Sequence, residues 1–554
     1  MPKPNVSTVD LAERWAREQP DRVWLEEGND DEHRRTWTWR SAQAEYQAIA
    51  AWMQAEFGAD GARIAILSKN RAHWYLADMA IAASGNVSVP IFTTLNAATV
   101  EYILTFSGAT LLVLGQAENW DRIRHVVPAG VRILTLPGVD RPEGAIGWNE
   151  VREAYSGRYP DHRCRPSDLH TIVFTSGTTG LPKGVLQTHD SMVIPMVRAM
   201  AFCGVRQHPQ FLSYLPLSHI GERQLVLIMS LIACGSVRFN ESLATLVRDM
   251  GQTRPTFFFG APRVWEMLRQ HVIALSGSQQ AFDAELSAQP EQTGDRVRRL
   301  LGFTDYDYLL TAAAPIPASL IHWYDRLGIR INEGFGQTEA MGLVMNTDAV
   351  RRIGSIGKPI GDVQIRLSSE GELLARADGC SPGYYRDPIK TAETFVDGWI
   401  HTGDKGRVDE DGFYYLTGRV KDYFKTIHGK FVTPVPIEDA CAANKDIEQL
   451  CLLGRGYAKT VLVCVLSTLA WKKQRTELET GLRATVDAVN ATLERHARIG
   501  AVIVAREAWT IDNGLLTPTL KMRRNEVEAR FGARAEALAT AAASQGRVLL
   551  EFGD

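Results

Sequence analysis

Short aliphatic runs alternate with longer amphipathic stretches over the first 400 or so residues, and this alternation strongly limits the possible fold. Two of the amphipathic stretches, Ala42–Phe57 and Ala72–Ser84, have the spacing of helices. Alternation of this kind predicts an α/β protein of mainly parallel sheets with helices on their faces, with ligands gathering at the carboxyl ends of the strands. The buried strands that we expect are Arg63–Leu67, Val87–Phe92, Thr110–Leu114, Val131–Leu136 and Thr171–Phe174.

The pattern changes after about residue 400, and 554 residues are too many for one hydrophobic core. We therefore predict a large N-terminal domain (1–420) and a small α+β C-terminal domain (421–554). The polar segment 276–300 is expected to be a surface excursion. In the C-terminal part we expect, in order, strand Gly412–Gly418, a charged segment Arg419–Lys425, strands Gln449–Gly454 and Thr460–Ser467, helix Glu479–Ile499 and strand Ala501–Trp509.

Charge and cysteine content exclude several classes of protein. The 61 basic and 64 acidic residues give a net charge of −3, which argues against broad binding to nucleic acid. The seven cysteines are scattered without a CxxC pair, so neither a disulfide framework nor a zinc site is expected, and a reducing cytoplasm fits. The longest apolar run, Leu225–Cys234, is about half a membrane span and predicts a buried helix. With no apolar signal core at the N-terminus, we predict a soluble cytoplasmic chain in which only peripheral membrane contact stays open.

The segment Thr171–Val185 (TIVFTSGTTGLPKGV) has the composition of a phosphate-binding loop. Its glycines, Gly177 and Gly180, let the backbone N–H groups turn toward an anion. Lys183 adds a positive charge, and each charge-assisted hydrogen bond contributes about 1.5–3 kcal/mol. The spacing GxxGxxKG does not match the P-loop of the NTPases, GxxxxGK[ST]. The hydroxyl donors are Thr175, Ser176, Thr178 and Thr179.

TSGTTGLPKG resembles the signature of the adenylate-forming superfamily, which comprises acyl-CoA synthetases, firefly-type luciferases and peptide-synthetase adenylation domains. The resemblance covers nearly the whole chain, and the expected fold is that of these enzymes. The other matching motifs, in order, are Tyr214–Arg223 (YLPLSHIGER), Thr311–Pro317 (TAAAPIP), Glu333–Glu339 (EGFGQTE), His401–Asp404 (HTGD), Gly418–Lys425 (GRVKDYFK) and Thr517–Arg524 (TPTLKMRR).

The resemblance implies a role for each matching residue in nucleotide binding. Residues 175–183 would bind the β- and γ-phosphates, Phe335 would stack on adenine, and Asp404 and Arg419 would contact the ribose. TAAAPIP has more alanine than the Gly-Ala form that is usual in the family. This difference would narrow the part of the site on which the adenine ring rests. The residues expected to contact ATP or AMP are Thr175, Ser176, Gly177, Thr178, Thr179, Gly180, Lys183, Ala313, Glu333, Gly334, Phe335, Gly336, Gln337, Asp404 and Arg419.

Four residues are implied in catalysis. Lys521 would offset the negative charge that develops when a carboxylate attacks the α-phosphorus. Thr338 would hydrogen-bond the α-phosphate, and Glu339 would hold Mg²⁺, a cation that prefers oxygen ligands. His219 would lie near the acyl carboxylate, although a histidine in an apolar stretch is as readily a structural residue.

The second half-reaction requires a path for coenzyme A. The resemblance implies a mobile C-terminal domain that rotates about Lys421 between the two steps. His428 and Gly429 lie where the family often has Gly-Gly beside the pantetheine tunnel, so His428 departs from the pattern. No base for the thiol is identified.

The expected function is an ATP-dependent acyl-CoA ligase with ATP, Mg²⁺ and coenzyme A. The motifs are most similar to the long-chain and bubblegum-type fatty acyl-CoA synthetase branch, and Ala340, Met341 and Gly342 would line the acyl pocket. The sequence does not distinguish a long-chain fatty acid from a medium-chain, branched, aromatic or polycyclic acid as the substrate. The alternatives are an acyl-AMP ligase that loads a carrier protein, a luciferase-like oxidase and a catalytically silent nucleotide sensor. In GFGQTE, Glu339 occupies the position of a small residue in GxGxxG, which argues against a Rossmann dehydrogenase.

Overall fold

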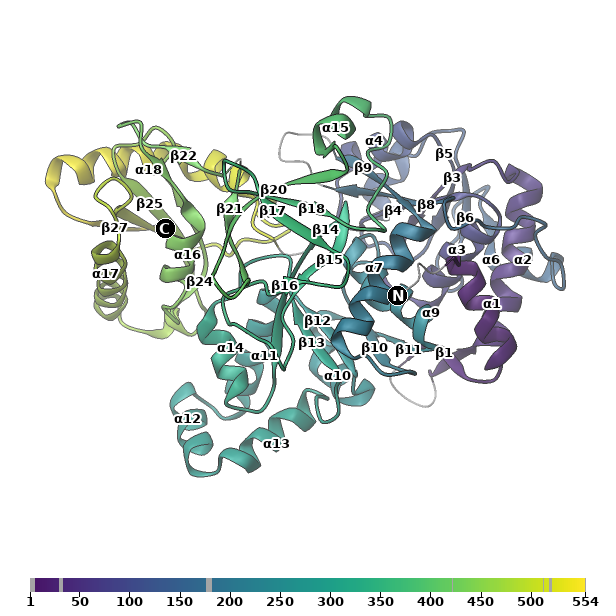
Figure 1. Cartoon of the computed structure of the whole chain (residues 1–554), viewed down its shortest axis with the longest axis horizontal. Coiled ribbons are helices and arrows are strands. Elements are labelled where there is room, and N and C mark those ends of the chain that lie inside the picture. Colours follow the sequence, from purple (N-terminus) through teal and green to yellow (C-terminus); the bar gives the residue numbers. More distant parts are fainter. Residues whose placement is uncertain are drawn as a thin grey trace.

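The computed structural model describes residues 5–28, 33–175, 182–420, 422–511, 513–517 and 521–553. Figure 1 shows a large N-terminal part with several sheets and a separate C-terminal domain at one end of the molecule. The predicted α/β class and the separate small domain are confirmed.

A seven-stranded sheet organises the first third of the chain. Its strands run parallel except β9, which returns antiparallel to β8. All five strands predicted from the aliphatic runs belong to it, with ends shifted by at most two residues. In sheet order the strands are β7 (Ile146–Gly147), β6 (Arg132–Thr135), β5 (Ala109–Leu114), β3 (Arg63–Leu67), β4 (Val87–Ile91), β8 (Leu169–Thr175) and β9 (Lys183–Thr188).

Three further sheets complete the N-terminal part. The first is mainly parallel, the second changes from parallel to antiparallel at β14, and the third is antiparallel. The first consists of β10 (Gln210–Ser213), β11 (Ser236–Phe239), β1 (Val23–Glu27) and β2 (Arg35–Thr38). The second consists of β12 (Phe257–Gly260), β13 (Tyr308–Thr311), β14 (Ile331–Gln337), β15 (Ala340–Met345) and β16 (Lys358–Pro359). The third consists of β17 (Gln364–Leu367), β18 (Glu372–Arg376), β20 (Trp399–Val408) and β19 (Phe395–Val396), with β21 (Tyr414–Arg419) beside β20.

Helices cover these sheets, and local sequence sets their ends. Asn96 caps α4 by accepting from the Thr99 backbone, and Gly108 ends it with φ +67°, a left-handed conformation that suits glycine. The helices are α1 (Thr8–Glu18), α2 (Trp39–Phe57), α3 (Ala72–Ala83), α4 (Ala97–Ser107), α5 (Trp120–Ile123), η1 (Arg124–Val126), α6 (Trp148–Ala154), α7 (His189–Cys203), α8 (Ile220–Glu222), the π-helix η2 (Arg223–Ile228), α9 (Met229–Ala233), η3 (Leu243–Thr245), α10 (Leu246–Thr253), α11 (Pro262–Leu275), α12 (Gln279–Ala288), α13 (Pro290–Leu300), α14 (Ala318–Asp325) and α15 (Pro388–Thr394).

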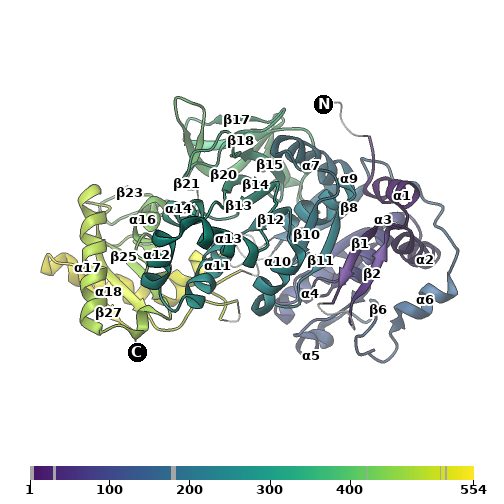
Figure 2. The same ribbon diagram turned by 90° about the horizontal axis from the view of Figure 1, so that it is seen from below.

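The C-terminal domain is α+β, as predicted. A four-stranded sheet packs with helices α16, α17 and α18, and Figure 2 shows this domain at one end of the molecule. The elements are β22 (Phe424–Lys425), β23 (Phe431–Val432), α16 (Pro434–Cys441), β24 (Ile447–Leu453), β25 (Thr460–Leu466), η4 (Ala470–Lys472), α17 (Arg475–Thr492), β26 (Ile499–Ala505), α18 (Arg524–Gln545) and β27 (Leu549–Phe552).

The polar segment 276–300 lies mostly at the surface, as predicted, and it is helical. It forms α12 and α13 because Phe282, Leu286 and Val297 supply an apolar stripe that packs into the core around Trp265. One prediction of local structure is wrong. The helix expected over Glu479–Ile499 instead covers Arg475–Thr492. Leu493 is extended (ψ 146°), which ends that helix before β26 begins.

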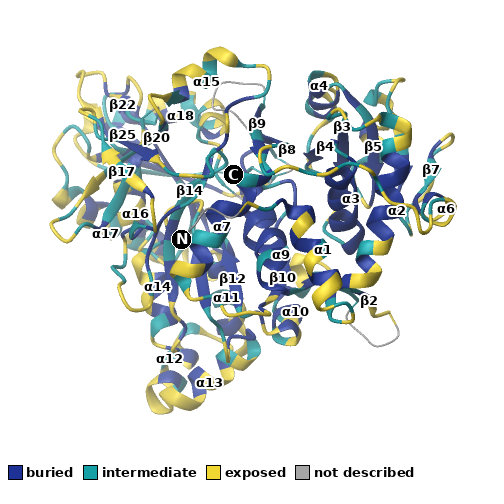
Figure 3. Cartoon of the chain, turned by 45° about the vertical axis from the view of Figure 1, so that its right-hand side comes forward, coloured by how far each residue is buried: buried dark blue, intermediate teal, exposed yellow. Residues whose placement is uncertain are grey.

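The buried apolar residues that the structure describes in the N-terminal part form three clusters, one of which surrounds α3. Figure 3 shows α3 and the strands β3, β4 and β5 largely buried, and every residue of α3 is buried. Leu225–Cys234, predicted as a buried helix, is buried throughout except for the partly buried Ile232 and is divided between η2 and α9. Within the described ranges, each helix is too short or too polar to cross a bilayer.

Candidate active site

A cleft of about 2730 Å³ lies between the N-terminal sheets and the C-terminal domain. A pocket for a single small ligand has roughly 300–1,000 Å³, so this cleft has room for a nucleotide and a second substrate. It opens at the carboxyl ends of the parallel strands β8 and β13, where ligands of α/β sheets gather. The predicted residues that line it are Thr175, Lys183, His219, Ala313, Glu333, Gly334, Phe335, Gly336, Gln337, Thr338, Glu339, Asp404, Arg419 and Lys521.

The ends of the predicted phosphate loop are fixed by a strand pair. Thr175 ends β8 and is the register partner of Lys183, which begins β9. Ser176, Gly177, Thr178, Thr179 and Gly180 lie outside the described residues. The ammonium of Lys183 lies 5.8 Å from the centroid of the Tyr384 ring, so the one cation of this motif faces the cleft beside an aromatic wall.

Thr338 and Glu339 form the turn between β14 and β15. The buried side chain of Gln187, on β9, donates to the Thr338 carbonyl at 2.5 Å. The Tyr384 hydroxyl donates to Glu339 Oε1 at 2.6 Å, and burial together with the Glu339 charge raises the pKa of Tyr384. Glu339 therefore offers carboxylate oxygens of which one, Oε1, is already oriented by a neighbour.

The donor set around Glu339 fits Mg²⁺ bound jointly with a polyphosphate. Among the described residues, no group of three or more acidic, histidine or cysteine side chains could hold a metal ion. Mg²⁺ is usually bound by one or two carboxylates together with substrate phosphates and water, rather than by a cage of protein ligands. Glu339 therefore fits as the protein ligand that such a metal would need, close to where Lys183 faces the cleft.

Asp404 and Arg419 form a second polar cluster opposite the turn. They are register partners on β20 and β21, and Arg419 Nε donates to Asp404 Oδ1 at 3.0 Å. Gln337 Nε2 donates to Asp404 Oδ2 at 2.8 Å. Burial raises the pKa of Asp404 although Arg419 opposes this, and the Asp404 charge raises the pKa of Arg419. The carboxylate is thus fixed in orientation, with one cation beside it.

Two small residues of the predicted adenine site, Gly336 and Ala313, have backbone positions that larger residues would not fit. A Cβ on Gly336 would lie 3.0 Å from the Gly342 backbone nitrogen and 3.2 Å from Met341 Cα, so β14 and β15 meet this closely only with glycine there. Ala313, after β13, has φ +77°. That left-handed conformation costs an alanine about 1–2 kcal/mol. The backbone is therefore strained at the residue predicted to lie beneath the adenine ring.

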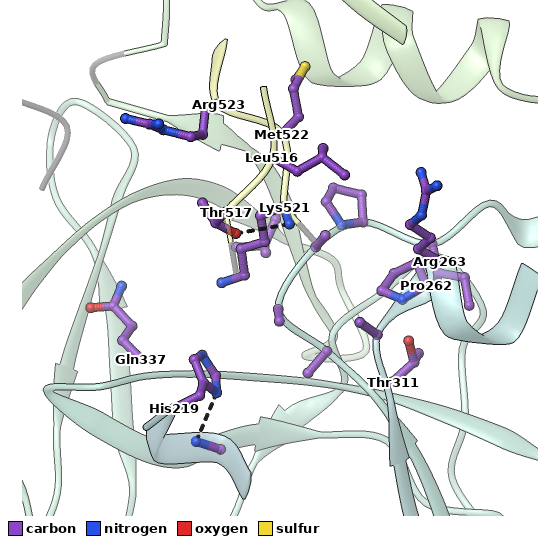
Figure 4. Close-up of a pocket in the computed structure, with 18 of the residues that line it drawn as sticks. His219, Pro262, Arg263, Thr311, Gln337, Leu516, Thr517, Lys521, Met522 and Arg523 are labelled. Carbon is purple, nitrogen blue, oxygen red and sulfur yellow. Dashed lines mark hydrogen bonds between the residues drawn. The ribbon is translucent and has the colours of Figure 1, made fainter. Parts of the chain in front are cut away.

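His219 is held in one tautomer. It caps α8, and its Nδ1 accepts from the Gly221 backbone N–H at 3.1 Å, as Figure 4 shows. Burial and the nearby Lys521 charge lower the pKa of His219 to about 3, so the ring is neutral. Because Nδ1 accepts, the proton is on Nε2, which makes His219 a hydrogen-bond donor and not a base.

Lys521 enters the same cleft from the C-terminal domain. Its backbone N–H donates to Thr517 Oγ1 at 3.0 Å, within a short bridge between Leu516 and Met522. Figure 4 shows its side chain reaching from this segment toward the side of the cleft that holds His219 and Gln337. Burial and the Arg419 charge lower the pKa of Lys521, while Asp404 opposes this.

The two domains also meet through charged side chains, of which the sequence analysis selected only Glu333. Arg263 on α11 pairs with Glu448 on β24 at 3.4 Å. Burial raises the pKa of Glu333 to about 8, and Asp439 on α16 adds to that effect. Burial and Glu438 raise the pKa of Asp439 to about 7.

Not every predicted site residue reaches the cleft. His428 and Gly429 form the exposed turn between β22 and β23 and are absent from its lining. Lys421, the predicted hinge, lies outside the described residues. Conversely, Gln187 and Tyr384 support the Thr338–Glu339 turn without any motif to mark them, because their neighbours in space are about 150 and 45 residues away in sequence.

Comparisons with known proteins agree with this geometry. The family model described as AMP-binding enzyme matches residues 12–385, and the model of an AMP-binding enzyme C-terminal domain matches residues 421–542. The long-chain-fatty-acid–CoA ligase FadD15 of Mycobacterium bovis is 29% identical, over 86% of this chain and 88% of its own length. The long-chain-fatty-acid–CoA ligase ACSBG2 of Gallus gallus, a bubblegum-type enzyme, is 26% identical over 84% and 73%.

Solved structures share the fold. The anthranilate CoA ligase AuaEII in complex with anthranoyl-AMP superposes with a TM-score of 0.80 at 20% identity, covering 97% of this chain and 99% of its own. The adenylation domain of a carboxylate reductase from Mycobacterium chelonae gives 0.81 at 22% identity, covering 97% and 92%. The predicted resemblance is thereby confirmed: the chain belongs to the AMP-binding enzyme family and has the adenylate-forming enzyme fold.

Proposed function

We propose that this chain activates a hydrophobic carboxylic acid with ATP to give an acyl-adenylate, and then transfers the acyl group to coenzyme A. The main evidence for this proposal is that Lys521, from the C-terminal domain, lines the same cleft as Glu339, Asp404 and His219 of the N-terminal part. Membership of the AMP-binding enzyme family and the names of its acyl-CoA ligase relatives support the same reaction.

In the first half-reaction a carboxylate oxygen attacks the α-phosphorus of ATP, and the bond to the bridging oxygen of pyrophosphate breaks. Two anions meet, and negative charge builds on the phosphoryl and leaving oxygens. The Lys521 ammonium neutralises this charge where it develops, in a cleft where water screens it little. No proton moves in this step, which suits a site whose histidine is neutral.

His219 orients the acid in this mechanism. Its Nε2–H donates to the carboxylate oxygen that does not attack, because Nδ1 is occupied by Gly221. A neutral donor fixes the carboxylate without the loss of nucleophilicity that an imidazolium would cause.

The remaining polar residues bind the nucleotide. Asp404 Oδ1 and Oδ2 accept from the two ribose hydroxyls, with Arg419 as a second ribose contact. Phe335 stacks on adenine between Gly334 and Gly336, with Ala313, Glu333 and Gln337 around it. Residues 175–183, which include Lys183, bind the β- and γ-phosphates, and Thr338 donates to the α-phosphate. When bound, Mg²⁺ supplies further neutralisation of the phosphates, and Glu339 is the residue that would hold it.

The second half-reaction needs another arrangement, because the CoA thiol must reach the acyl carbonyl and AMP must leave. The domain boundary proposed at 420/421 lies just before the segment matched by the C-terminal family model, which begins at residue 421. Rotation about Lys421 would remove Lys521 from the cleft and bring the exposed turn of His428 and Gly429 toward it as a pantetheine contact.

The acid is expected to be fatty or otherwise hydrophobic. Buried Met196 and Ala199 on α7, Leu225 on η2 and Phe259 on β12 line the cleft, together with Met341 and Gly342 on β15. The relatives named as long-chain fatty acid ligases support this class. One relative from Arabidopsis thaliana is named as peroxisomal, whereas we propose the cytoplasm for this chain.

The deciding experiment measures pyrophosphate release with a panel of acids that differ in length, branching and aromaticity, with and without CoA. We expect acid-dependent pyrophosphate release and, with CoA, accumulation of the thioester. Holo-carrier protein as an alternative acceptor tests the loading alternative. Absence of pyrophosphate release with every acid would contradict the proposal. Faster acyl transfer to the carrier protein than to CoA would show that the acceptor is the carrier protein and not CoA.

A further inference from the structure

Glu222 is a buried carboxyl group that the reaction does not use. It ends α8, three residues after His219, and its side chain is fully buried. Oε1 accepts from the Tyr214 backbone N–H at 3.1 Å. Oε2 is buried and has no hydrogen-bond partner among the described residues.

The neighbouring cation does not neutralise Glu222. Arg223 points to a different buried cluster, where its Nη2 donates to both carboxylate oxygens of Asp78 at 2.6 and 2.7 Å, and its Nη1 donates to Thr171 Oγ1 at 2.6 Å. Two adjacent buried residues of opposite sign therefore face different partners. A buried carboxylate without a cation is costly, and such a group is usually neutral instead.

The titratable groups around Glu222 do not favour its ionisation. Tyr75 on α3 and Tyr214 lie close enough to feel its charge, and burial holds the pKa of both well above the usual value, so both are neutral. Ser213 and the amides of Tyr214 and Leu215 favour the charged form. Burial outweighs them and raises the pKa of Glu222 to about 8.

Glu222 closes the loop that carries His219. The hydrogen bond to Tyr214 joins the end of the segment 214–222 to its start, and the Tyr214 hydroxyl donates to the Phe259 carbonyl at 2.7 Å. Asn70 holds the middle of the same loop, donating to Leu215 O at 2.6 Å and accepting from the Leu217 N–H at 3.1 Å. With both ends fixed, the Nδ1 contact of His219 with Gly221 directs Nε2 away from the loop's own backbone.

We propose that Glu222 is a positioning residue that acts in its protonated form, holding the 214–222 loop so that His219 presents Nε2–H to the acid substrate. An ionised Glu222 draws water or a cation into the loop base and displaces His219. The inference rests on the proposed adenylation for its kinetic consequence, while the protonation state can be tested without activity.

The test compares wild type with Glu222→Gln and Glu222→Ala. Glutamine reproduces the shape and neutrality of the protonated acid, whereas alanine leaves the Tyr214 N–H unpaired. At neutral pH we expect Glu222→Gln to keep acid-dependent pyrophosphate exchange within about threefold of wild type, and Glu222→Ala to lose roughly tenfold or more. The KM for the acid should rise in Glu222→Ala while the KM for ATP changes little.

The pH profile separates this role from simple packing. Folded Glu222 binds its proton more tightly than the unfolded chain does, so wild type should lose stability relative to Glu222→Gln as pH rises from the ordinary carboxyl pKa of 4.5 to about 8, and the difference should be constant at higher pH. The same variant should retain pyrophosphate exchange at alkaline pH where wild type declines, until Lys521 itself deprotonates. Glu45→Gln is the matched control, since Glu45 is also buried but accepts from Trp37 and Trp148, and it should leave the alkaline decline unchanged.

Three results would overturn the proposal. One is a difference in melting temperature between wild type and Glu222→Gln that does not change with pH between about 5 and 8. Another is a loss of exchange at neutral pH in folded Glu222→Gln as large as in Glu222→Ala, which would mean that the ionised form is needed. The third is an unchanged KM for the acid in folded Glu222→Ala. The melting comparison still decides the protonation state if no acid supports exchange, so its outcome is distinguishable from failure of the proposed function.

Discussion

The two faces of the cleft are built differently. On the N-terminal face, Glu339 and Asp404 each have a side-chain hydrogen bond from a partner fixed by a sheet or turn, Tyr384 and Gln337 respectively. On the C-terminal face, Lys521 is carried by the small domain, where its backbone pairs with Thr517 beside the bridge between Leu516 and Met522. Pre-organised groups suit binding, whereas a group carried by a separate domain suits a step that must be made and then undone.

The largest expected effect comes from removing the charge on the C-terminal face. Lys521→Ala should lower the rate of acyl-adenylate formation roughly 10²–10³-fold with little change in the KM for ATP, because the ammonium acts on charge that develops in the transition state. Acid-dependent pyrophosphate exchange measures this. Lys472→Ala, an exposed lysine of the same domain, serves as control. A normal rate of acyl-adenylate formation in Lys521→Ala would show that the C-terminal face supplies no catalytic charge.

The second prediction tests whether the C-terminal face must leave. Lys421→Pro should spare acyl-adenylate formation and reduce thioester formation by about tenfold or more, because proline removes the backbone freedom that rotation requires. Pyrophosphate exchange and CoA thioester formation are measured on the same preparation, with Lys421→Ala as control. Equal loss in both half-reactions would contradict the hinge assignment.

The third prediction concerns the N-terminal face. Asp404→Asn should raise the KM for ATP by about tenfold to a hundredfold, as expected for loss of charge-assisted hydrogen bonds to the ribose. Asp409→Asn changes a carboxylate just after β20 that pairs with Arg352, and it should alter melting temperature without altering the KM for ATP. A fall in the maximal rate with an unchanged KM would place Asp404 in the chemical step instead.

The smallest effect is expected where the two faces touch. Arg263 and Glu448 form a partly exposed ion pair, and such pairs contribute about 0–1 kcal/mol. Arg263→Ala and Glu448→Ala should each change the ratio of the two half-reaction rates by less than about fivefold, and the double variant should match the single ones if the pair acts as a unit. Strictly additive effects of the two substitutions would show that the ion pair does not connect the domains.

The sequence by itself determined the strand–helix alternation, the division into two domains and the candidate residues of the nucleotide site. Aliphatic runs such as Arg63–Leu67 coincide with β3, because a strand buried on both faces needs continuous apolar residues. The predicted phosphate loop was identified from residue type and spacing, since binding a polyphosphate close to the backbone requires glycines, hydroxyls and a cation in a short stretch. The EGFGQTE segment was selected through its resemblance to the adenylate-forming superfamily.

Only the tertiary structure decided which distant groups meet and what charge they carry. The polar segment 276–300 became two helices because three apolar residues found a core to pack against. Tyr384 donates to Glu339, and Arg223 pairs with Asp78 and not with Glu222, its neighbour in sequence. The pKa values of Glu222, His219 and Lys521 depend on burial and on neighbours from other elements, and no local pattern of residues contains that information.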